Sequence, residues 1–326
     1  MTDKGHPSAS KPVAVIDIGS NSIKVLVAQR KSSGRIRSLD THALEVRIST
    51  GISRKPPRLG EEGMQAGVAA VQALLARSLR FEPAAIHIVA TSAVRDAVNG
   101  ADFRSRIKSA TGIDIRILSG EEEANLIGRG LLTDPAVSGF SDFYLFDLGG
   151  GSLECLSFRA RRVTQAVSLP LGCVRLTELC VPDPRLPFSS EHRAAVVSRV
   201  TATLEASSFS FDLGPNADAL FIGGTITATR FLIAASNTTA PEAAPTNLSV
   251  SEIEKVFSRI APMTLEERKN VPALPPARAD VLPVALATVL TLAEIGGIQN
   301  FQTSFHNLRW GIADESLPIV RPAHQA

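Results

Sequence analysis

One pattern occurs twice in the chain, 130 residues apart, and it restricts the fold more than any other feature of the sequence. Residues 13–28 read VAVIDIGSNSIKVLVA and residues 143–158 read FYLFDLGGGSLECLSF. The matched polar and glycine positions are Asp17 with Asp147, Gly19 with Gly149, and Ser22 with Ser152. Each copy is an apolar strand, a tight turn and a second apolar strand, which is typical of a β-hairpin. Two unrelated hairpins would share only their apolar positions, so we interpret the match as a duplicated domain.

The rest of each half alternates predicted helices with short apolar strands, as in an α/β protein. Residues 61–80 carry apolar side chains at helical spacing, and residues 86–90 and 219–222 are typical of buried strands. Further helices are expected after Thr91 or Ser92, after Ser119, near Thr227, and over 251–259 and 279–294, with a strand over 113–118 and loops over 49–60 and 234–249. A turn-rich stretch near 133–141 separates the halves, so we predict domains over 13–133 and 134–320 behind a disordered tail over 1–12.

Composition excludes several classes of protein. The chain of 326 residues is 44% hydrophobic and carries a net charge of +2, so it lacks the concentrated basic character of nucleic-acid-binding proteins. Its most apolar stretch, 281–298, is interrupted by Pro283 and Glu294 and falls short of a membrane span. The three cysteines show no metal-ligand spacing, and no secretion signal precedes the first strand. We therefore expect a cytoplasmic protein with neither nucleic acid nor membrane as a partner.

The second copy of the turn predicts an anion-binding site. It reads Asp147-Leu148-Gly149-Gly150-Gly151-Ser152-Leu153-Glu154. Three glycines leave the turn without Cβ atoms, so successive backbone N–H groups can point at one phosphate, and the Ser152 hydroxyl can add a donor. Asp147 repels phosphate but suits Mg²⁺, a hard cation that prefers oxygen ligands. The alternative is an ordinary glycine-rich hairpin turn.

The first copy, Asp17-Ile18-Gly19-Ser20-Asn21-Ser22, offers a similar set of groups on a less flexible turn. Ser20, Asn21 and Ser22 can donate hydrogen bonds to a phosphate oxygen. Asp17 can share a cation with Asp147 if the two turns face each other across a cleft. The alternative is that Asp17 only caps the backbone of its own turn.

Glu123 is the candidate general base. Ser119 and Glu122 form the capping box of a predicted helix, and acidic residues are expected in its first turn. Glu123, however, shares a helix face with Leu126 and Ile127, so it is expected to point inward. Burial of a carboxylate there is costly in free energy unless a partner or a function compensates for it. Partial burial would raise its pKa toward that of a base able to activate water. The residues alone leave the roles of cap and base equally open.

A third glycine turn, Gly223-Gly224-Thr225, follows a predicted strand and precedes a helix. It is either a phosphate or nucleotide cradle at a helix N-terminus or an ordinary connection. The basic residues near the turns are Lys24, Arg47, Arg95, Arg175 and Arg309. Of these, Arg95 is the preferred phosphate contact, because it begins a helix at the sheet edge where the turns gather, and Arg47 is the second choice. Cys173 fits a buried structural thiol better than a nucleophile.

Six segments occur in an order that resembles the exopolyphosphatase and guanosine pentaphosphate phosphatase (Ppx/GppA) family: VIDIGSNSIKVLVA, TSAVRDA, SGEEEANLIGRG, FDLGGGSLE, LPLGCVRLTE and NLRWG. The resemblance extends from about Val13 to about Asp314 and is specific as a set. It implies the duplicated actin-like ATPase (ribonuclease H-like) fold, with two domains and a cleft between them. It also implies an enzyme that uses Mg²⁺, with Mn²⁺ as an alternative, to hydrolyse the terminal phosphoanhydride of polyphosphate or of pppGpp.

By this resemblance Glu123 is the general base and Asp147 the metal ligand, with Asp17 and Glu154 as further candidate ligands. The implied phosphate-binding residues are Asn21, Arg95, Gly149, Gly150, Gly151 and Ser152, with Gly172 and Cys173 lining the same site. Leu153 stands where the family more usually has Thr, directly after the serine of the phosphate loop. The third glycine turn is short, which weakens the case for nucleotide recognition. The sequence ends soon after the second domain, so it resembles compact members without C-terminal helical domains, and short polyphosphate chains are the expected substrate.

Three rival functions stay open from the sequence. The first is the same reaction on a phosphorylated guanosine nucleotide, pppGpp, which the predicted site does not separate from polyphosphate. The second is a sugar or acid kinase, which the weak third turn disfavours. The third is a non-catalytic phosphate or alarmone sensor, which retention of both Glu123 and Asp147 disfavours. A homodimer is also left open.

Overall fold

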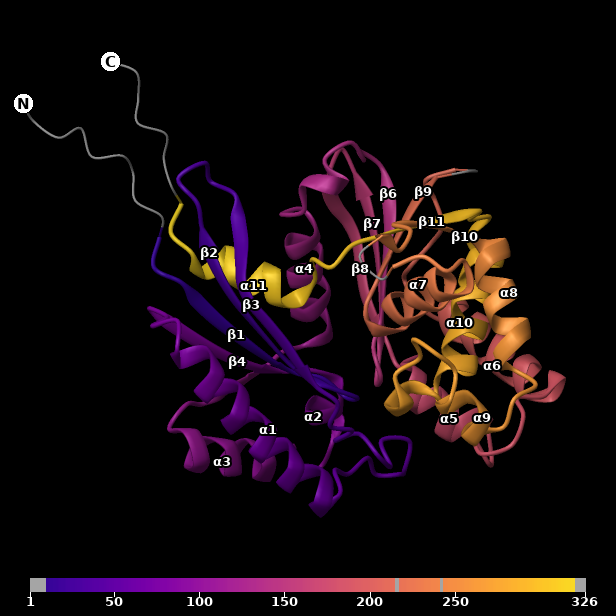
Figure 1. The fold of residues 1–326 in the computed structure, drawn as a ribbon, viewed down its shortest axis with the longest axis horizontal. Helices are drawn as coiled ribbons and strands as arrows, with labels where there is room; N and C mark the ends of the chain where they lie inside the picture. Colours follow the sequence, from indigo (N-terminus) through magenta and orange to yellow (C-terminus); the bar gives the residue numbers. More distant parts are fainter. Residues whose placement is uncertain (1–9, 215–216, 241–242, 320–326) are drawn as a thin grey trace, which may run out of the picture.

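Two mixed β-sheets form the framework of the protein, one in each half of the chain (Figure 1). The structure is a computed structural model that describes residues 10–214, 217–240 and 243–319. The first sheet has the strand order β3-β2-β1-β4-β5, and the second has the order β10-β11-β9-β6-β7-β8. The strands are β1 Val13–Ile18, β2 Ile23–Arg30, β3 Ile36–Leu44, β4 Ala85–Ala90, β5 Ile115–Ile117, β6 Phe143–Leu148, β7 Leu153–Arg159, β8 Arg162–Leu169, β9 Asp218–Ile222, β10 Asn247–Ser249 and β11 Asn300–Thr303.

The two sheets are built on the same plan, which confirms the duplication predicted from the repeat. Strand β1 pairs antiparallel with β2 and parallel with β4, and β6 pairs antiparallel with β7 and parallel with β9. The hairpin registers also match, since Asp17 lies opposite Lys24 and Asp147 lies opposite Glu154. The third strand of each meander, β3 or β8, was not predicted. Both aspartates therefore stand at the same end of equivalent central strands.

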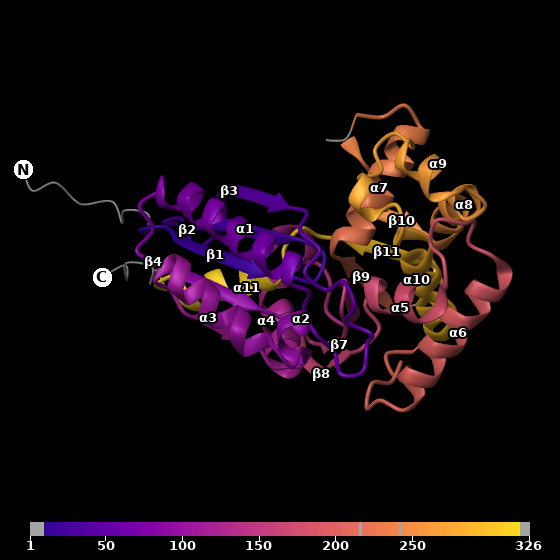
Figure 2. The same ribbon diagram turned by 90° about the horizontal axis from the view of Figure 1, so that it is seen from below.

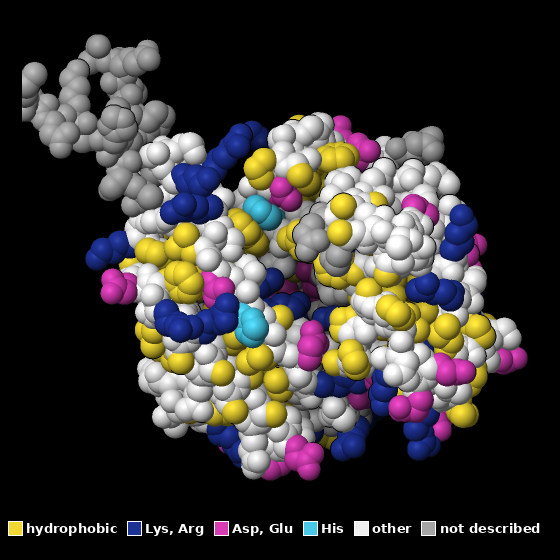
Figure 3. All heavy atoms as spheres, in the orientation of Figure 1, with side chains coloured by type: hydrophobic (Ala, Val, Ile, Leu, Met, Phe, Trp, Pro, Cys, Tyr) yellow, Lys and Arg dark blue, Asp and Glu magenta, His cyan; other side chains and the backbone are white. Residues whose placement is uncertain are grey.

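Helices cover the outer faces of the sheets and also fill the space between them (Figures 1 and 2). Helix α1 packs on the first sheet, α11 contacts β1 and β2, and α4 lies between α11 on one side and β7 and β8 on the other. The helices are α1 Glu61–Leu79, α2 Ser92–Asp96, α3 Gly100–Thr111, α4 Gly120–Leu131, α5 Cys173–Cys180, α6 Ser190–Glu205, α7 Gly224–Ser236, α8 Val250–Ile260, α9 Leu265–Lys269, α10 Leu282–Gly296 and α11 Leu308–Ser316. The space-filling view shows a hollow between the two halves, with charged side chains in it (Figure 3).

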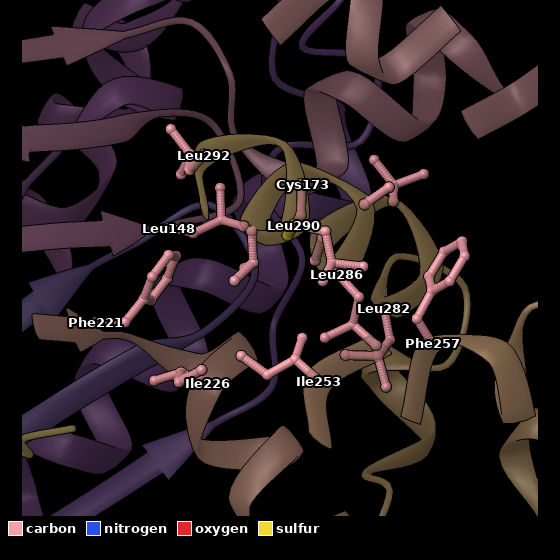
Figure 4. Close-up of a cluster of buried hydrophobic side chains, with 14 of the residues drawn as sticks. Leu148, Cys173, Phe221, Ile226, Ile253, Phe257, Leu282, Leu286, Leu290 and Leu292 are labelled. Carbon is pink, nitrogen blue, oxygen red and sulfur yellow. The ribbon is translucent and has the colours of Figure 1, made fainter. Parts of the chain in front are cut away.

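Three apolar clusters hold these layers together. One joins the first sheet to α1 and α3, a middle one packs α4 and α11 between the two sheets, and the third fills the second half around α10. Figure 4 shows part of the third cluster, where Leu286 and Leu290 of α10 lie near Ile253 of α8. Helix α10 is the apolar stretch seen in the sequence, and Pro283 lies in its first turn, where no backbone donor is required. No helix in the described part of the chain is long and apolar enough to cross a membrane.

The last helix returns to the first half of the molecule. Arg30 at the end of β2 donates through Nη2 to Oδ1 of Asp314 in α11 at 2.8 Å, and α11 packs along β1 and β2. Residues 1–9 of the expected tail and residue 320 of the expected second domain lie outside the described residues. Within the described part of that tail, Ser10 donates its N–H to Arg30 O at 3.0 Å. The domain division at 133/134 stays a prediction, because α11, which belongs to the expected second domain, packs against strands of the first half.

Most expected elements are present with shifted ends. Helix α7 begins at Gly224 and not near Thr227, because Gly223, with φ of 101°, turns the chain directly into the helix. The expected loop over 234–249 is shorter at both ends, since α7 runs to Ser236 and residues 247–249 form β10. Thr91 is the N-cap residue of α2, but its side chain makes no capping hydrogen bond.

Candidate active site

The two glycine turns meet at a cavity of about 80 Å³ between the halves. Sheet-end residues of both hairpins form most of its wall, together with the start of α4 and the third glycine turn. The lining residues are Asp17, Gly19, Ser20, Asn21, Ser22, Lys24, Thr91, Ser92, Glu123, Ile127, Asp147, Leu148, Gly149, Gly150, Gly151, Ser152, Glu154, Gly223, Gly224, Arg278, Asn307 and Leu308. The structure thus brings together most of the residues that the sequence suggested for one site.

Glycine is required where the turns touch. A Cβ on Gly150 would lie 2.8 Å from Ser20 Cβ, and one on Gly151 would lie 2.6 Å from Ser20 Oγ and 2.3 Å from Ser92 Oγ. Side-chain carbons do not approach other atoms this closely, so any larger residue would push the turns apart. The close approach explains why the second turn carries more glycine than the first.

The start of α5 holds the second turn from behind. Cys173 donates its N–H to Gly149 O at 2.9 Å, and Val174 donates its N–H to Gly150 O at 2.9 Å. Because a trans peptide places N–H and C=O on opposite sides, the N–H groups of Gly150 and Gly151 point away from α5. These amides are therefore available as donors to an anion in the cavity.

Gly172 and Cys173 support this turn and do not form part of the cavity wall. A Cβ on Gly172 would lie 2.3 Å from the backbone of Gly150 and Gly151. Cys173 is buried, and burial raises the pKa of its thiol, which leaves it without the thiolate that a nucleophile needs. Thr225 is also buried and off the wall, and its carbonyl accepts a hydrogen bond from Thr229 Oγ1 at 2.9 Å.

Asp17 and Asp147 line the cavity from equivalent positions. Burial raises the pKa of both carboxyls, that of Asp147 to about 6, while the Lys24 ammonium acts in the opposite direction. Oδ1 of Asp17 is buried without a hydrogen-bond partner, so the side chain does not cap its turn through this atom. Gly223 leaves room for Asp147, since a Cβ there would lie 2.6 Å from its Oδ1.

These two carboxylates fit a hard divalent cation. Burial of a carboxylate oxygen without a partner is unfavourable in free energy, and a bound cation would offset this cost. Among the described residues, no three His, Cys, Asp or Glu side chains gather as a complete ligand set. Mg²⁺ commonly accepts one or two carboxylates and completes its shell with water and phosphate oxygens. Asp17 and Asp147 are therefore suited to hold such an ion beside a phosphate.

Glu123 lies at the start of α4 with 5% of its surface exposed. The capping box of Ser119 and Glu122 is present, so Glu123 is not needed to cap the helix. Burial raises the pKa of its carboxyl to about 7, although the Arg95 guanidinium lowers it. This combination of position and pKa is suited to a general base near neutral pH.

Arg95 contacts Glu123 and does not form part of the cavity wall. Its Nη1 donates to Glu123 Oε2 at 2.8 Å and to Leu118 O at 3.0 Å. The sequence placed Arg95 near the site, but Arg95 lies in the last turn of α2 and not at the start of a helix as expected. The structure directs its side chain at the Glu123 carboxylate, whose orientation it fixes. A direct phosphate contact for Arg95 stays a prediction that this geometry does not favour.

Glu154 reaches the cavity from β7. Its Oε1 accepts a hydrogen bond from Ser168 Oγ at 2.7 Å. Burial raises the pKa of its carboxyl well above the ordinary value, and the nearby carboxylates of Glu123 and Asp147 raise it further. A carboxyl that keeps its proton is a poor cation ligand, so Asp17 and Asp147 are better placed than Glu154 for that role.

Several cavity residues were not selected from the sequence. Lys24 faces the cavity from β2, Arg278 from a short 3₁₀ helix over Pro276–Arg278, and Asn307 from the start of α11. Lys24 was among the basic residues near the turns, and Asn307 belongs to the NLRWG segment. Ser92 was named only as a possible helix cap, although it lies in the TSAVRDA segment. Arg278 gave no local pattern that could have identified it, since only the folded chain brings it to the turns.

Solved structures share this fold over nearly the whole chain. An exopolyphosphatase from Cytophaga hutchinsonii superposes with a TM-score of 0.85 at 19% identity, covering 94% of this chain and 99% of that one. A PPX-GPPA enzyme from Aquifex aeolicus gives a TM-score of 0.75 at 24% identity, covering 94% of this chain and 100% of that one. An exopolyphosphatase-like protein gives 0.82 at 23% identity, with 94% and 98% covered. The duplicated actin-like fold is thereby confirmed.

The sequence itself matches a family model that agrees with this fold. The model of the Ppx/GppA phosphatase family covers residues 26–319, which include Glu123, the second glycine turn and the NLRWG segment. The match begins just after the first turn, whose equivalence to the second rests on the repeat. The expected resemblance is confirmed, and the chain belongs to the Ppx/GppA phosphatase family.

Proposed function

We propose that this protein hydrolyses the terminal phosphoanhydride bond of short inorganic polyphosphate chains and releases orthophosphate. The observation that carries the proposal is the position of Glu123, which lines the same cavity as both glycine turns and both aspartates. A base, anion donors and candidate cation ligands thus surround one small space. Membership of the Ppx/GppA phosphatase family supports a phosphoanhydride hydrolase.

The cavity wall would bind the terminal phosphoryl group mainly through the glycine turns. Gly150, Gly151 and Ser20 lie in the wall where the two turns meet, so the glycine N–H groups that point away from α5 and the Ser20 hydroxyl can donate to a phosphoryl oxygen there. Lys24 and Arg278 add positive charge at the same wall, which offsets the charge of the polyanion. Asp17 and Asp147 would hold Mg²⁺ or Mn²⁺, which when bound neutralises phosphate charge.

Glu123 would act on water. Its carboxylate accepts a proton from a water molecule whose oxygen forms a new bond to the terminal phosphorus. The bond from that phosphorus to the bridging oxygen breaks, and the shortened chain leaves with the electron pair on that oxygen. The hydrogen bond from Arg95 keeps the Glu123 carboxylate in one orientation. Positioning and charge neutralisation dominate such reactions.

Substitution of Glu123 by Gln tests this proposal. The amide keeps the shape and can still accept from Arg95, but it takes no proton, so turnover should fall by roughly 10²- to 10⁴-fold with folding intact. Glu121→Gln, on an exposed residue of the same helical turn, is the matched control and should keep its activity. The assay is orthophosphate release from short polyphosphate with Mg²⁺. Near-native turnover of Glu123→Gln would exclude the base assignment, and no release by the wild type would favour a non-catalytic binding protein.

A second candidate is the same reaction on a nucleotide such as pppGpp. A hollow of about 700 Å³ adjoins the cavity and shares Lys24, Gly223, Gly224, Arg278 and Asn307 with it. Apolar and aromatic side chains form much of its wall, including Phe231, Phe305 and Trp310. Such a lining suits a nucleoside base better than a second run of phosphates.

The two candidates differ in measurable specificity. Values of kcat/KM for short polyphosphate, long polyphosphate and pppGpp should be compared at one Mg²⁺ concentration and one pH. Use of the apolar hollow predicts a higher kcat/KM for pppGpp than for any polyphosphate. The proposed function predicts the reverse, with short chains preferred over long ones.

A further inference from the structure

The segment that follows β3 connects the first glycine turn to the second half of the protein. Ser49 donates its N–H to Ser20 O at 3.3 Å, within the first turn. Four residues later, Ser53 donates through its N–H at 3.0 Å and its Oγ at 2.6 Å to Glu178 Oε2 of α5. One short segment therefore contacts a phosphate-binding turn at one end and the opposite half at the other.

Arg47, in the same segment, connects Asn21 of the first turn to Asp280 of the second half. Its Nε donates to Asn21 Oδ1 at 2.7 Å. Its two terminal nitrogens donate to the two oxygens of Asp280, the Nη2–Oδ1 distance being 2.9 Å, and Nη2 also donates to Ala277 O at 2.7 Å. A forked pair of this kind fixes orientation more firmly than a single contact. The guanidinium is thus shared between Asn21 and the second half.

The Asn21 side chain is held at both of its polar atoms. Arg47 occupies Oδ1, and Nδ2 donates to Glu45 Oε2 at 3.2 Å. Glu45 in turn lies 3.6 Å from the Nη2 of Arg278, which belongs to the second half and to the cavity wall. Two bridges from the second half therefore converge on one residue of the phosphate cavity.

We propose that Arg47 is a positioning residue that couples the position of the second half, through Asp280, to the placement of Asn21 in the phosphate cavity. All of its directed contacts go to Asn21, Asp280 and a backbone carbonyl, and Arg47 is not part of the cavity wall. Without the Asp280 carboxylate, Arg47 loses its forked partner and Asn21 loses its fixed orientation. The inference rests on the proposed function, because it assigns a consequence for turnover to this geometry.

The test uses Arg47→Gln, Asp280→Asn and the double variant. Arg47→Gln should lower kcat by on the order of 10²-fold, the effect of misplacing a binding group. Asp280→Asn should lower kcat by about tenfold, and the double variant should be no worse than Arg47→Gln, because Asp280 acts only through Arg47. KM should change little, since neither side chain contacts the substrate.

A control pair separates this role from general stability. Arg193 and Glu254 form a similar forked pair, with both contacts at 3.1 Å, but they lie within the second half. Arg193→Gln should leave kcat unchanged. The proposal is overturned if losses from Arg47→Gln and Asp280→Asn multiply in the double variant, if only KM rises, or if kcat stays within about twofold of wild type.

Hydrogen exchange provides a readout that does not depend on activity. The amides of Gly51 and Ser53, which donate to the Glu178 carboxylate of the second half at 2.7 and 3.0 Å, should exchange about tenfold faster in Asp280→Asn than in the wild type, because these interhalf contacts break more often. If the wild type hydrolyses no substrate while exchange changes in this way, the proposed function fails and the coupling stands. Unchanged exchange together with unchanged kcat removes the coupling and leaves the proposed function intact.

Discussion

At Glu123, burial and a neighbouring cation act on one carboxyl in opposite directions. Burial raises its pKa to about 7, and the hydrogen bond and charge of Arg95 lower it. The carboxylates of Asp17 and Asp147 add to the upward shift. The pKa of the proposed base is therefore held near neutral pH by a balance in which Arg95 is the main opposing group.

This balance predicts a pH profile. In the wild type, kcat should fall about tenfold per pH unit below pH 7, because only the deprotonated carboxylate accepts a proton. Arg95→Met removes the group that lowers the pKa of Glu123, so the acid limb should shift to higher pH. Arg77→Met, which breaks a pair with Asp40 outside the cavity wall, should leave the profile in place. A rise in KM without any shift would instead support the phosphate contact that the sequence suggested for Arg95.

The residues of the site differ in how far the sequence could place them. Glu123 was recognisable because it lies on an apolar helix face, and Asp147 because it precedes three glycines. Arg95 was placed in the correct region, but a sequence position does not give the direction of a long side chain. Lys24 became meaningful only with the hairpin register, which sets it opposite Asp17.

At the scale of elements, the contact between α5 and the second glycine turn determines where the donors point. Gly172 lies immediately before α5, and its missing side chain allows the backbone of Gly150 to approach. The hydrogen bonds from the first turn of α5 then direct the carbonyls of the glycine turn away from the cavity. The cavity donors therefore depend on a residue outside the cavity wall.

Gly172→Ala tests this dependence. Its Cβ would lie 2.3 Å from backbone atoms of Gly150 and Gly151, and backbone cannot rotate aside, so unfolding free energy should fall by about 1–3 kcal/mol. Phosphate release should fall as well, because the turn must shift. Gly139→Ala meets no atom within 4 Å and should change neither property. Urea unfolding and phosphate release measure the two effects, and retained activity in a destabilised Gly172→Ala protein would separate α5 from the site.

The elements that the sequence predicted well are those with strong local patterns. The hairpins, α1 and α4 have clear periodicity, and α4 also has its capping box. Helix α11 was not predicted, because it has only 9 residues and its closest contact with α4 is made at a glycine. A Cβ on Gly311 would lie 1.9 Å from Leu126 O, so the two helix backbones touch where a larger apolar residue would have given a signal.

At the scale of the whole molecule, duplication gathers acidic residues around one cavity. Each half contributes an aspartate from an equivalent strand, and the repeat in the sequence was sufficient to predict that pairing. The positions opposite them have diverged, since Lys24 in the first hairpin corresponds to Glu154 in the second. The sequence offset shows this difference, but only the assembled halves show that Glu154 lies near Glu123 and Asp147.

The acidic residues around the cavity make the stability of the protein depend on pH through Glu154. Its pKa is raised well above 4.5 in the folded protein, so the folded state binds this proton more tightly than the unfolded state. The contribution to stability is therefore largest below pH 4.5 and is lost as the pH rises toward the folded pKa. Glu154→Gln cannot lose a proton and can still accept from Ser168, so its stability relative to the wild type should grow with pH, by at most about 1.4 kcal/mol per unit.

Urea unfolding at pH 5, 6, 7 and 8 in the presence of a chelator measures this difference. Burial lowers the pKa of His87 and His306, which acts in the opposite sense below pH 6.5, but both proteins share these residues and their effect cancels. Glu266→Gln, on an exposed side chain, should run parallel to the wild type. A constant difference between Glu154→Gln and the wild type would show that Glu154 titrates normally. A difference that grows with pH would show that the buried acidic residues of the cavity destabilise the metal-free protein. Their presence would then be explained by the function of the cavity and not by stability.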